Sequence, residues 1–295
     1  MQLQGRIIKG VGGFYEVLSG GIIHTCRAKG RFRREGLTPL PGDNVEFTPG
    51  AGEGLGSVDG ILPRRNLLLR PAMANVDTLV LVTSACDPPP DLLLLDKLML
   101  SVAVLNVEAL LVINKCDLAS AGAADALARQ YALAVPCVLQ VSAVDGRGMK
   151  DLLERLKGRC SCLAGQSGVG KTSLINALFP GRVLETGSIS QRSSRGRHTT
   201  RHAELLPVPG GGEVADTPGF SLMELDSMEP SQLPYCYPEF APYVGQCRFA
   251  GCMHDAEPGC AVKEAAAAGQ IPAERLRRYG EILAETREKW RDRYD

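Results

Sequence analysis

The segment Gly165–Thr172 reads GQSGVGKT and constrains the fold more than any other part of the chain, because it fits the phosphate-binding pattern G-x-x-x-x-G-K-[ST]. Short apolar runs precede it at 160–164 and follow it at 174–179, so we expect a strand, a loop and a helix. The glycines let backbone N–H groups point inward, and the helix adds the positive end of its dipole. A chance glycine turn would not be expected to match the pattern and both flanks. The sequence predicts an α/β domain with a phosphate site lined by Gly165, Gln166, Ser167, Gly168, Val169, Gly170, Lys171, Thr172 and Ser173.

Composition limits the class of protein. The chain has 295 residues and a formal net charge of zero, so affinity for nucleic acid has to come from local basic patches. Charged residues such as Asp96 and Lys97 interrupt the longest apolar run, which excludes a membrane span. Ten cysteines without an apolar signal core indicate reduced thiols or a metal site. We therefore expect a cytoplasmic protein with no membrane partner.

Residues 1–70 have the pattern of a small all-β domain. Five short apolar runs alternate with glycine- and proline-containing turns, which predicts an OB-fold barrel. Five basic residues lie between Arg27 and Arg34, with Phe32 among them. This loop either holds RNA phosphates while the aromatic ring stacks on a base, or is a solvated basic loop. The expected strands are Gly5–Val11, Phe14–Leu18, Ile22–Arg27, Asn44–Phe47 and Ser57–Leu62.

Residues 71–158 change to a β/α pattern. Val76–Ser84 is almost continuously apolar, as expected of a strand buried on both faces, and Asp91 is placed to cap the helix that follows. The next expected strand, Val107–Ile113, leads into Asn114-Lys115-Cys116-Asp117. A later strand, Cys137–Val141, leads into Ser142-Ala143. Both motifs are therefore expected where an open α/β sheet binds ligands, at the carboxyl ends of its strands.

Asn114-Lys115-Cys116-Asp117 resembles the N-K-x-D guanine box of GTPases, and Ser142-Ala143 resembles its partner loop. Guanine presents adjacent N1–H and N2–H donors, which the carboxylate of Asp117 can accept together. Adenine has no such donor pair and would leave the carboxylate unpaired, which is strongly disfavoured. By resemblance, Asn114 supports the purine edge, the Lys115 stem lies along the base, and the Ala143 N–H reaches the carbonyl oxygen.

These boxes occur in an unusual order. Ordinary GTPases run from the P-loop through a switch threonine and D-x-x-G to N-K-x-D and S-A. Here N-K-x-D and S-A come first, followed by the P-loop, the switch and D-x-x-G. Cutting the chain after the D-x-x-G strand and joining the old termini gives this order, which is permissible because termini often lie close together. The sequence predicts the same sheet with different connectivity.

Residues 187–202 are rich in serine, glycine and arginine, and they occupy the place of the first switch. Either Thr199 or Thr200 can supply the hydroxyl that joins Mg²⁺, and resemblance favours Thr200. A basic linker without a switch role is the alternative. Downstream, residues 216–219 match D-x-x-G, so Asp216 is expected to hold Mg²⁺ through water and the Gly219 N–H to sense the γ-phosphate. The expected Mg²⁺ residues are thus Thr172, Thr200 and Asp216.

Phe220 stands where many GTPases carry the glutamine that orients the attacking water. A phenyl ring can neither accept nor donate a proton, so another group has to act. His198, with a near-neutral pKa and a place on the switch, is the candidate; a structural role or a contact to RNA phosphate is the alternative. Lys171, which neutralises the β- and γ-phosphates, and Gly219 complete the set of catalytic candidates.

Residues 225–295 contain the cluster Cys247, Cys252, His254 and Cys260, a complete tetrahedral donor set for Zn²⁺. Four protein ligands close the site, which argues for a structural metal and against a zinc enzyme. Unligated buried cysteines are the alternative, and Cys236 is a possible substitute ligand. Helices are expected over Val262–Ala268 and Ala273–Trp290. Three arginines of the second helix face either RNA or solvent: Arg275, Arg277 and Arg278.

The permuted boxes, the basic R-G-R-H-T-T switch, D-T-P-G-F and the Cys₃His cluster together resemble the circularly permuted ribosome-assembly GTPases, and among them the small-subunit-dependent group. The resemblance covers essentially the whole chain; Arg201, where a third threonine is often found, is a departure. It implies an OB-fold RNA-binding domain over 1–70, a permuted P-loop GTPase domain over 71–224 and a small helical zinc-binding domain over 225–295. It further implies one structural Zn²⁺, Mg²⁺ with GTP, and a monomer.

By the same resemblance, the protein binds the 30S subunit and its 16S rRNA late in maturation and hydrolyses GTP to GDP and phosphate when the subunit stimulates it. A GTP-gated scaffold with incidental hydrolysis is the competing hypothesis. Turnover with and without the subunit separates the two.

Overall fold

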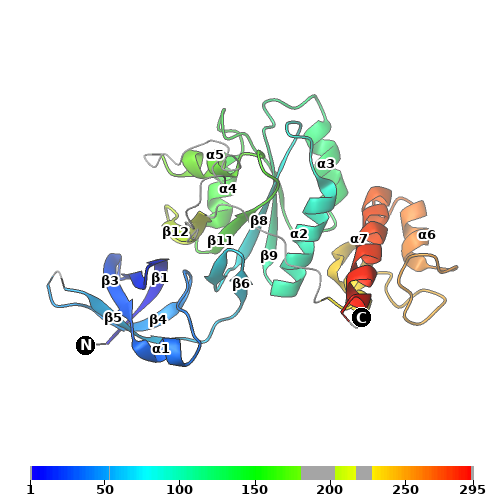
Figure 1. Ribbon diagram of the computed structural model, residues 1–295. Helices are drawn as coiled ribbons and strands as arrows, with labels where there is room; N and C mark the ends of the chain where they lie inside the picture. Colours follow the sequence, from blue (N-terminus) through cyan, green and yellow to red (C-terminus); the bar gives the residue numbers. More distant parts are fainter. Residues whose placement is uncertain (1, 53, 181–202, 217–227, 294–295) are drawn as a thin grey trace, which may run out of the picture. The chain divides into compact units, whose positions relative to one another are not determined.

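Figure 1 shows the computed structural model of the chain, which describes residues 2–52, 54–180, 203–216 and 228–293. The chain divides into two compact units, each built from segments that lie far apart in the sequence. The segment around residue 165 contributes to both units. The first unit comprises 1–80, 149–164 and 171–221, and the second comprises 81–148, 165–170 and 222–295.

Five strands near the N-terminus close into a barrel, which confirms the prediction from the spacing of the apolar runs. The strands pair in the order β1-β2-β3-β5-β4, and β4 pairs again with β1. All these pairs are antiparallel except β3 with β5. The result is the five-stranded barrel expected of an OB-fold. The strands are β1 (Leu3–Val11), β2 (Phe14–Ser19), β3 (Ile22–Ala28), β4 (Asn44–Thr48) and β5 (Gly56–Ile61).

The basic segment after β3 forms a short helix, α1 (Gly30–Arg34), where the sequence predicted a loop. This helix turns Phe32 inward, so that its ring is 4% exposed. The prediction that Phe32 can stack on a base is therefore wrong, because the ring completes the barrel core. Lys29 is ion-paired with Asp59 at 2.8 Å. The core residues are Ile7, Val17, Cys26, Phe32, Val45, Phe47 and Val58.

In the rest of the first unit, further strands continue the same sheet from the barrel's first strand. β11 pairs in parallel with β13, and β13 pairs antiparallel with β12. β12 in turn pairs with β1, where Glu204 lies opposite Lys9. Every residue of β11 is buried, so its two cysteines, Cys160 and Cys162, are packing residues of this sheet. The elements are β6 (Leu67–Leu69), β7 (Ala72–Ala74), α4 (Met149–Leu156), β11 (Cys160–Ala164), α5 (Lys171–Leu178), β12 (Glu204–Pro207) and β13 (Glu213–Asp216).

The second unit contains the parallel strands that carry the N-K-x-D and S-A motifs. β9 lies between β8 and β10 and pairs in parallel with β10. The apolar runs become β8 and β9 because both faces of these strands are covered, and nearly all of their residues are buried. Asp91 caps α2 as predicted, its Oδ1 accepting the Leu94 N–H at 2.9 Å. The elements are β8 (Thr78–Ser84), of which residues 81–84 belong to this unit, α2 (Leu92–Leu105), β9 (Glu108–Asn114), α3 (Ala123–Tyr131) and β10 (Val138–Gln140).

The order of these elements confirms the circular permutation. β9 and β10, which end in the guanine-box motifs, precede β11 and α5, which flank the P-loop. β12 and β13, which precede D-x-x-G, come last among the strands of the described chain. The loops that carry the motifs still follow the carboxyl ends of parallel strands. The change in connectivity therefore does not alter the local geometry of each loop.

The C-terminal part of the second unit is helical, as predicted, and surrounds a small core rich in aromatic rings. Tyr237, Phe240 and Tyr279 contact one another with ring centroids 4.9–5.1 Å apart. No helix in the described ranges is long and apolar enough to cross a membrane. The elements are two 3₁₀ helices, Pro230–Cys236 (η3) and Pro238–Phe240 (η4), followed by α6 (Ala261–Ala267) and α7 (Ala273–Arg291).

Two of the three arginines at the start of α7 do not face RNA or solvent. Arg275 and Arg278 are 1% and 3% exposed, and both are ion-paired with Asp96 of α2. The expectation for these two residues is wrong, because a buried carboxylate on a distant helix compensates their charge. Arg277 is exposed and pairs with Glu274 and Glu281 on its own helix.

Candidate functional site

The P-loop turn depends on glycine at particular positions. Gly165, Gly168 and Gly170 have φ angles of 151°, 82° and 94°, which residues with a Cβ rarely adopt. A Cβ at Gly165 would collide with the carbonyl oxygen of Val82, and one at Gly170 would collide with the Asn114 amide. The backbone is thus folded into a tight cradle of the kind in which consecutive N–H groups bind phosphate oxygens.

Asn114 joins the guanine-box strand to the P-loop. It is the last residue of β9 and is 1% exposed. Its Nδ2 donates to the Val169 carbonyl at 2.9 Å, and its Oδ1 accepts the Ala143 N–H at 3.3 Å. One buried amide therefore holds three predicted site segments together, although they lie far apart in the sequence.

The two loops at the guanine-box end are held rigid by local hydrogen bonds. The Cys116 N–H donates to the Val141 carbonyl at 3.1 Å, which ties the N-K-x-D loop to the S-A loop. Ser142 is fully buried, and its Oγ accepts the Asp145 N–H at 3.1 Å. Asp117 is exposed at the end of this assembly. Its carboxylate is therefore accessible to solvent and can accept hydrogen bonds from a ligand.

Sequence reasoning missed a contribution from residues 85–91, which connect β8 to α2. Lys115 Nζ donates to the Asp87 carbonyl at 2.7 Å, and the Asp91 N–H donates to Gln166 Oε1 at 3.2 Å. This connection therefore contacts both the guanine box and the P-loop. The available signal was Asp87 followed by three prolines directly after a buried strand, at the carboxyl end where ligands bind.

In the first unit, α5 begins at Lys171, and Thr172 follows in its first turn. Burial lowers the pKa of Lys171, and an anionic ligand beside the ammonium group would oppose this shift. β13 ends at Asp216, the last described residue before the D-x-x-G turn. A hydroxyl and a carboxylate are hard oxygen donors that suit Mg²⁺. Outside the described residues lie His198, Thr199, Thr200, Gly219 and Phe220, and the side chain of Asp216.

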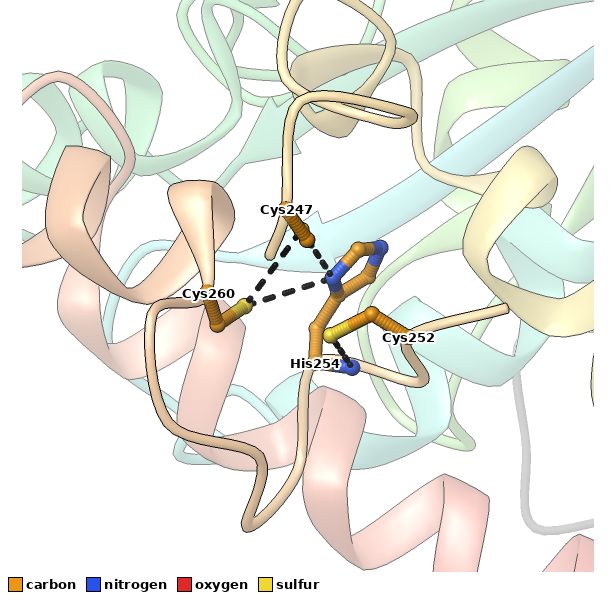
Figure 2. Close-up of side chains that lie close together, drawn as sticks. All are labelled: Cys247, Cys252, His254 and Cys260. Atoms are coloured by element: carbon orange, nitrogen blue, oxygen red, sulfur yellow. Dashed lines mark hydrogen bonds between the residues drawn. The ribbon is translucent and has the colours of Figure 1, made fainter. Parts of the chain in front are cut away.

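The predicted metal ligands converge in the C-terminal region, as Figure 2 shows for Cys247, Cys252, His254 and Cys260. Their ligand atoms all lie within 4.8 Å of one another. His254 Nδ1 is 3.6 Å from Cys247 Sγ and 3.4 Å from Cys260 Sγ, and these sulfurs are 3.9 Å apart. Tetrahedral Zn²⁺, with bonds of about 2.3 Å to sulfur and 2.0 Å to nitrogen, separates its ligands by roughly 3.5–3.8 Å. The cluster therefore could bind zinc.

Burial and the close approach of the four side chains shift pKa values within the cluster. Burial, together with the neighbouring Cys260 and Cys247 thiols, raises the pKa of Cys252 to about 12. Burial also lowers the pKa of His254, which favours the neutral imidazole that metals bind. Cys236 points elsewhere, with its Sγ donating to the Gln232 carbonyl at 3.6 Å. The compact set of four, without Cys236, is thus the group of the described chain whose ligand atoms lie close enough together to hold a metal ion.

Comparisons with known proteins agree with this geometry. The family described as RsgA GTPase matches residues 61–226, and the RsgA N-terminal domain matches residues 4–55. The chain is 47% identical over 289 residues to small ribosomal subunit biogenesis GTPase RsgA of Geobacillus thermodenitrificans, covering 97% of this chain and 98% of the relative. The corresponding protein of Ruminiclostridium cellulolyticum is 46% identical over 282 residues, covering 95% and 92%.

Solved structures show the same fold. YjeQ from Thermotoga maritima superposes with a TM-score of 0.84 at 34% identity, covering 97% of this chain and 99% of that one. YloQ, described as a circularly permuted GTPase, gives a TM-score of 0.81 at 32% identity, covering 98% and 96%. With the P-loop, the displaced guanine box and the Cys₃His cluster in place, the chain belongs to the RsgA GTPase family, whose members are GTP-hydrolysing enzymes.

Proposed function

We propose that this protein is a cytoplasmic, monomeric GTPase that binds the 30S ribosomal subunit and its 16S rRNA and assists late maturation of the subunit. The names of its relatives, small ribosomal subunit biogenesis GTPases, support the process. The observation that carries the nucleotide chemistry is the Asn114 amide, which bonds to both Val169 and Ala143. Residues 1–70 form the RNA-binding barrel, 71–224 the GTPase domain and 225–295 the zinc domain.

Within this proposal the guanine base is recognised by Asp117, whose carboxylate accepts both N1–H and N2–H. Asn114 orients the loop that presents Asp117, and the Ala143 N–H donates to the base carbonyl oxygen. The test is Asp117→Asn, which replaces one acceptor with a donor. GTP affinity is expected to fall by about two orders of magnitude. Affinity for the xanthine nucleotide, which has an oxygen in place of N2–H₂, is expected to rise; unchanged GTP affinity contradicts the assignment.

Phosphate chemistry is assigned to the P-loop and the two switches. The Gly165–Gly170 backbone N–H groups and Lys171 hold the β- and γ-phosphates, and bound Mg²⁺ neutralises the charge that develops on them. Thr172, Thr200 and Asp216 are the proposed Mg²⁺ residues, and the Gly219 N–H contacts the γ-phosphate. His198 accepts or orients the proton of the attacking water, in the role that Phe220 cannot fill. One structural Zn²⁺ is held by the Cys₃His cluster.

Turnover measurements test the reaction. We expect slow GTP hydrolysis by the intact chain and a large acceleration when purified 30S subunits are added. His198→Ala is expected to retain GTP binding and lose most of the accelerated rate. Equal turnover with and without subunits would favour a GTP-gated scaffold over an enzyme whose cycle the subunit controls. Full acceleration in His198→Ala would assign the proton to another group.

A further inference from the structure

Three aromatic side chains are exposed in the ranges that the structure describes: Phe14, Tyr235 and Phe249. The guanidinium carbon of Arg27 lies over the Phe14 ring, 4.6 Å from its centroid, and that of Arg248 lies over the Phe249 ring at 5.5 Å. Neither arginine forms an ion pair within those ranges. Each of the two units therefore displays an exposed phenyl ring together with a cation that no neighbouring acid neutralises.

The cations that the sequence offered to RNA mostly bind groups of the protein itself. Lys29 and Arg31 of the basic segment both bind Asp59, the first at its carboxylate and the second at its carbonyl. In α7, Arg277 pairs with two glutamates of its own helix, and the other two candidate arginines are buried. Contacts to RNA are therefore to be sought at other cations.

Phe14 and Arg27 lie on the outer face of the barrel. Side chains alternate along β2, and the residues of its other face pack into the core. Phe14 lies opposite Val11 of β1 and Arg27 of β3, in pairs whose Cβ atoms are about 4.5–5.5 Å apart. The ring is 39% exposed, and the acid of the next outward row, Glu16, lies opposite Lys9. This row of three thus combines open apolar surface with a positive charge and no negative charge.

Phe249 and Arg248 lie on a turn between two of the predicted metal ligands, Cys247 and Cys252. The Cys252 N–H donates to the Phe249 carbonyl at 3.3 Å, and the Arg248 N–H donates to the Gly259 carbonyl at 2.9 Å. The Arg248 side chain packs on Gly259, where an added Cβ would come within 3.0 Å of it. The ring is 46% exposed. A well-fixed backbone therefore presents this ring to solvent.

An exposed ring beside a guanidinium suits a nucleotide. Every base has a π-face that stacks on an aromatic side chain, and arginine binds phosphate oxygens through several N–H groups. Unpaired RNA offers both groups, because its bases can be splayed out of the stack, whereas those of a duplex are covered by their neighbours. A protein partner needs apolar area but no flat ring. The combination of a ring and an unneutralised cation favours single-stranded RNA.

We propose that Phe14 with Arg27, and Phe249 with Arg248, form two platforms, each of which stacks one unpaired RNA base and binds the phosphate of that nucleotide. The inference rests on the proposed function, because it takes RNA of the small subunit as the partner. It places the barrel's contact on the outer face of β1–β3 instead of the basic helix α1, and it adds a contact in the metal-binding region. Every base is accepted, because stacking does not read the base edge.

Single tryptophans in the full-length chain report each platform separately. Trp290, the sole tryptophan, is replaced by phenylalanine, and Phe14→Trp or Phe249→Trp is added. A base that stacks on the indole quenches its emission, so titration with an oligouridylate of about 12 nucleotides gives the affinity of that platform alone. Saturable quenching is expected at both positions. Leu37→Trp and Tyr235→Trp are the controls, because both positions are exposed but neither belongs to a platform, and no saturable quenching is expected there.

The arginines are tested in the same backgrounds. Arg27→Gln with Phe14→Trp, and Arg248→Gln with Phe249→Trp, are expected to weaken binding by at least about fivefold, because a charged hydrogen bond to phosphate is lost. The slope of log affinity against log salt concentration is expected to fall by about 0.7, the value for one phosphate contact on a single strand. Arg34→Gln with Phe14→Trp is the matched control, because it removes an exposed cation of α1 outside the platform, and is expected to change neither quantity.

Absence of saturable quenching at either platform, or equal quenching at the control positions, overturns the inference for that platform. Binding of 30S subunits gives a second check, since Phe14→Leu and Phe249→Leu keep apolar area but remove the flat ring. Each is expected to bind subunits at least about fivefold more weakly than the wild type. Equal binding by the leucine variants would indicate protein docking and would also overturn the inference. Failure of the wild type to bind 30S subunits would instead overturn the proposed function, whatever the oligouridylate titrations show.

Discussion

Asp96 in α2 and Arg275 in α7 form an ion pair from which solvent is excluded, with side chains 0% and 1% exposed. The same carboxylate accepts a hydrogen bond from Arg278 Nε at 2.6 Å and from the Tyr131 hydroxyl at 2.7 Å. Arg275 also reaches Glu239 at 2.6 Å. α2 follows the connection that contacts the guanine box and P-loop. The helix beside the nucleotide site therefore also anchors the helix beside the metal cluster.

Asp96→Asn is expected to lower the free energy of unfolding of this region by about 3–5 kcal/mol. The amide has nearly the same shape but leaves the guanidinium groups of Arg275 and Arg278 under-compensated in a buried place. Urea unfolding followed by the fluorescence of Trp290, the sole tryptophan, which lies in α7, measures the loss. A change below about 1 kcal/mol would show that the network carries little stability.

Lys97→Met provides the comparison on the neighbouring residue. Lys97 also joins α2 to α7, through Glu285 at 2.5 Å, but the two side chains are 17% and 32% exposed. Partly exposed pairs contribute about 0.2–1 kcal/mol, so this variant is expected to unfold close to the wild type. A loss of stability as large as that of Asp96→Asn would mean that partly exposed and buried ion pairs between the two helices contribute equally to the free energy of unfolding.

Asp96 also shows where sequence reasoning stops. In the sequence it is a charge within an apolar run, and it was useful as evidence against a membrane span. Its partners lie on α3 and α7, so no local pattern connects them. The same limit explains Phe32, whose basic neighbours suggested exposure while its ring fills the barrel core. In both cases, residues that lie far away in the sequence determine whether the side chain is buried.

The nucleotide and metal sites were easier to predict because the residues that form them occur in short sequence motifs. The P-loop needs glycine at Gly165 and Gly170 for reasons of backbone geometry, and tetrahedral metal binding needs four donors close together. Strand ends follow from buried apolar runs, so the motifs could be placed at the carboxyl edge of a sheet. The 85–91 connection was missed because it acts through the Asp87 carbonyl and the Asp91 N–H, which are backbone groups that almost every residue carries.

Gly170→Ala tests the contact between the P-loop and the guanine box. The new methyl group would collide with the Asn114 amide and break its hydrogen bond to Val169. Isothermal titration with GDP is expected to show at least about tenfold weaker binding, since a buried hydrogen bond is lost. Gly122→Ala is the control: its φ of 79° carries the same strain, of about 1 kcal/mol, but a Cβ there meets nothing within 4 Å. Equal loss of affinity in both variants would assign the effect to strain alone.

Metal content tests the Cys₃His cluster. Purified wild type is expected to contain one zinc per chain by atomic emission, and Cys260→Ser is expected to lose it, because three ligands no longer close the tetrahedron. Loss of the metal should also change Trp290 emission, since Cys260 belongs to the core on which α7 rests. Cys236→Ser, a nearby thiol bonded to Gln232, is expected to keep its zinc. Zinc retained in Cys260→Ser would place the metal elsewhere.

The barrel's stability is expected to depend on pH through Asp59. Burial alone would raise the pKa of this carboxyl, but hydrogen bonds from Lys29, Thr48 and Ser57 outweigh it and hold the pKa below the ordinary value of 3.8. A lowered pKa in the folded state means that the stabilisation is present above the unfolded pKa and is lost as the pH falls through the folded one. The loss therefore belongs below about pH 4, and neutral pH leaves it intact.

Acid titration of the β5 amides by NMR in the full-length chain measures this dependence. Asp59→Asn is expected to be less stable than the wild type at neutral pH and to lose less stability on acidification, because it has no carboxylate to protonate. Ser57→Ala removes one donor, at 2.7 Å, so its carboxyl protonates at a higher pH and its acid transition begins earlier than in the wild type. Coincident acid transitions in all three proteins would show that Asp59 does not control the acid limit of the barrel.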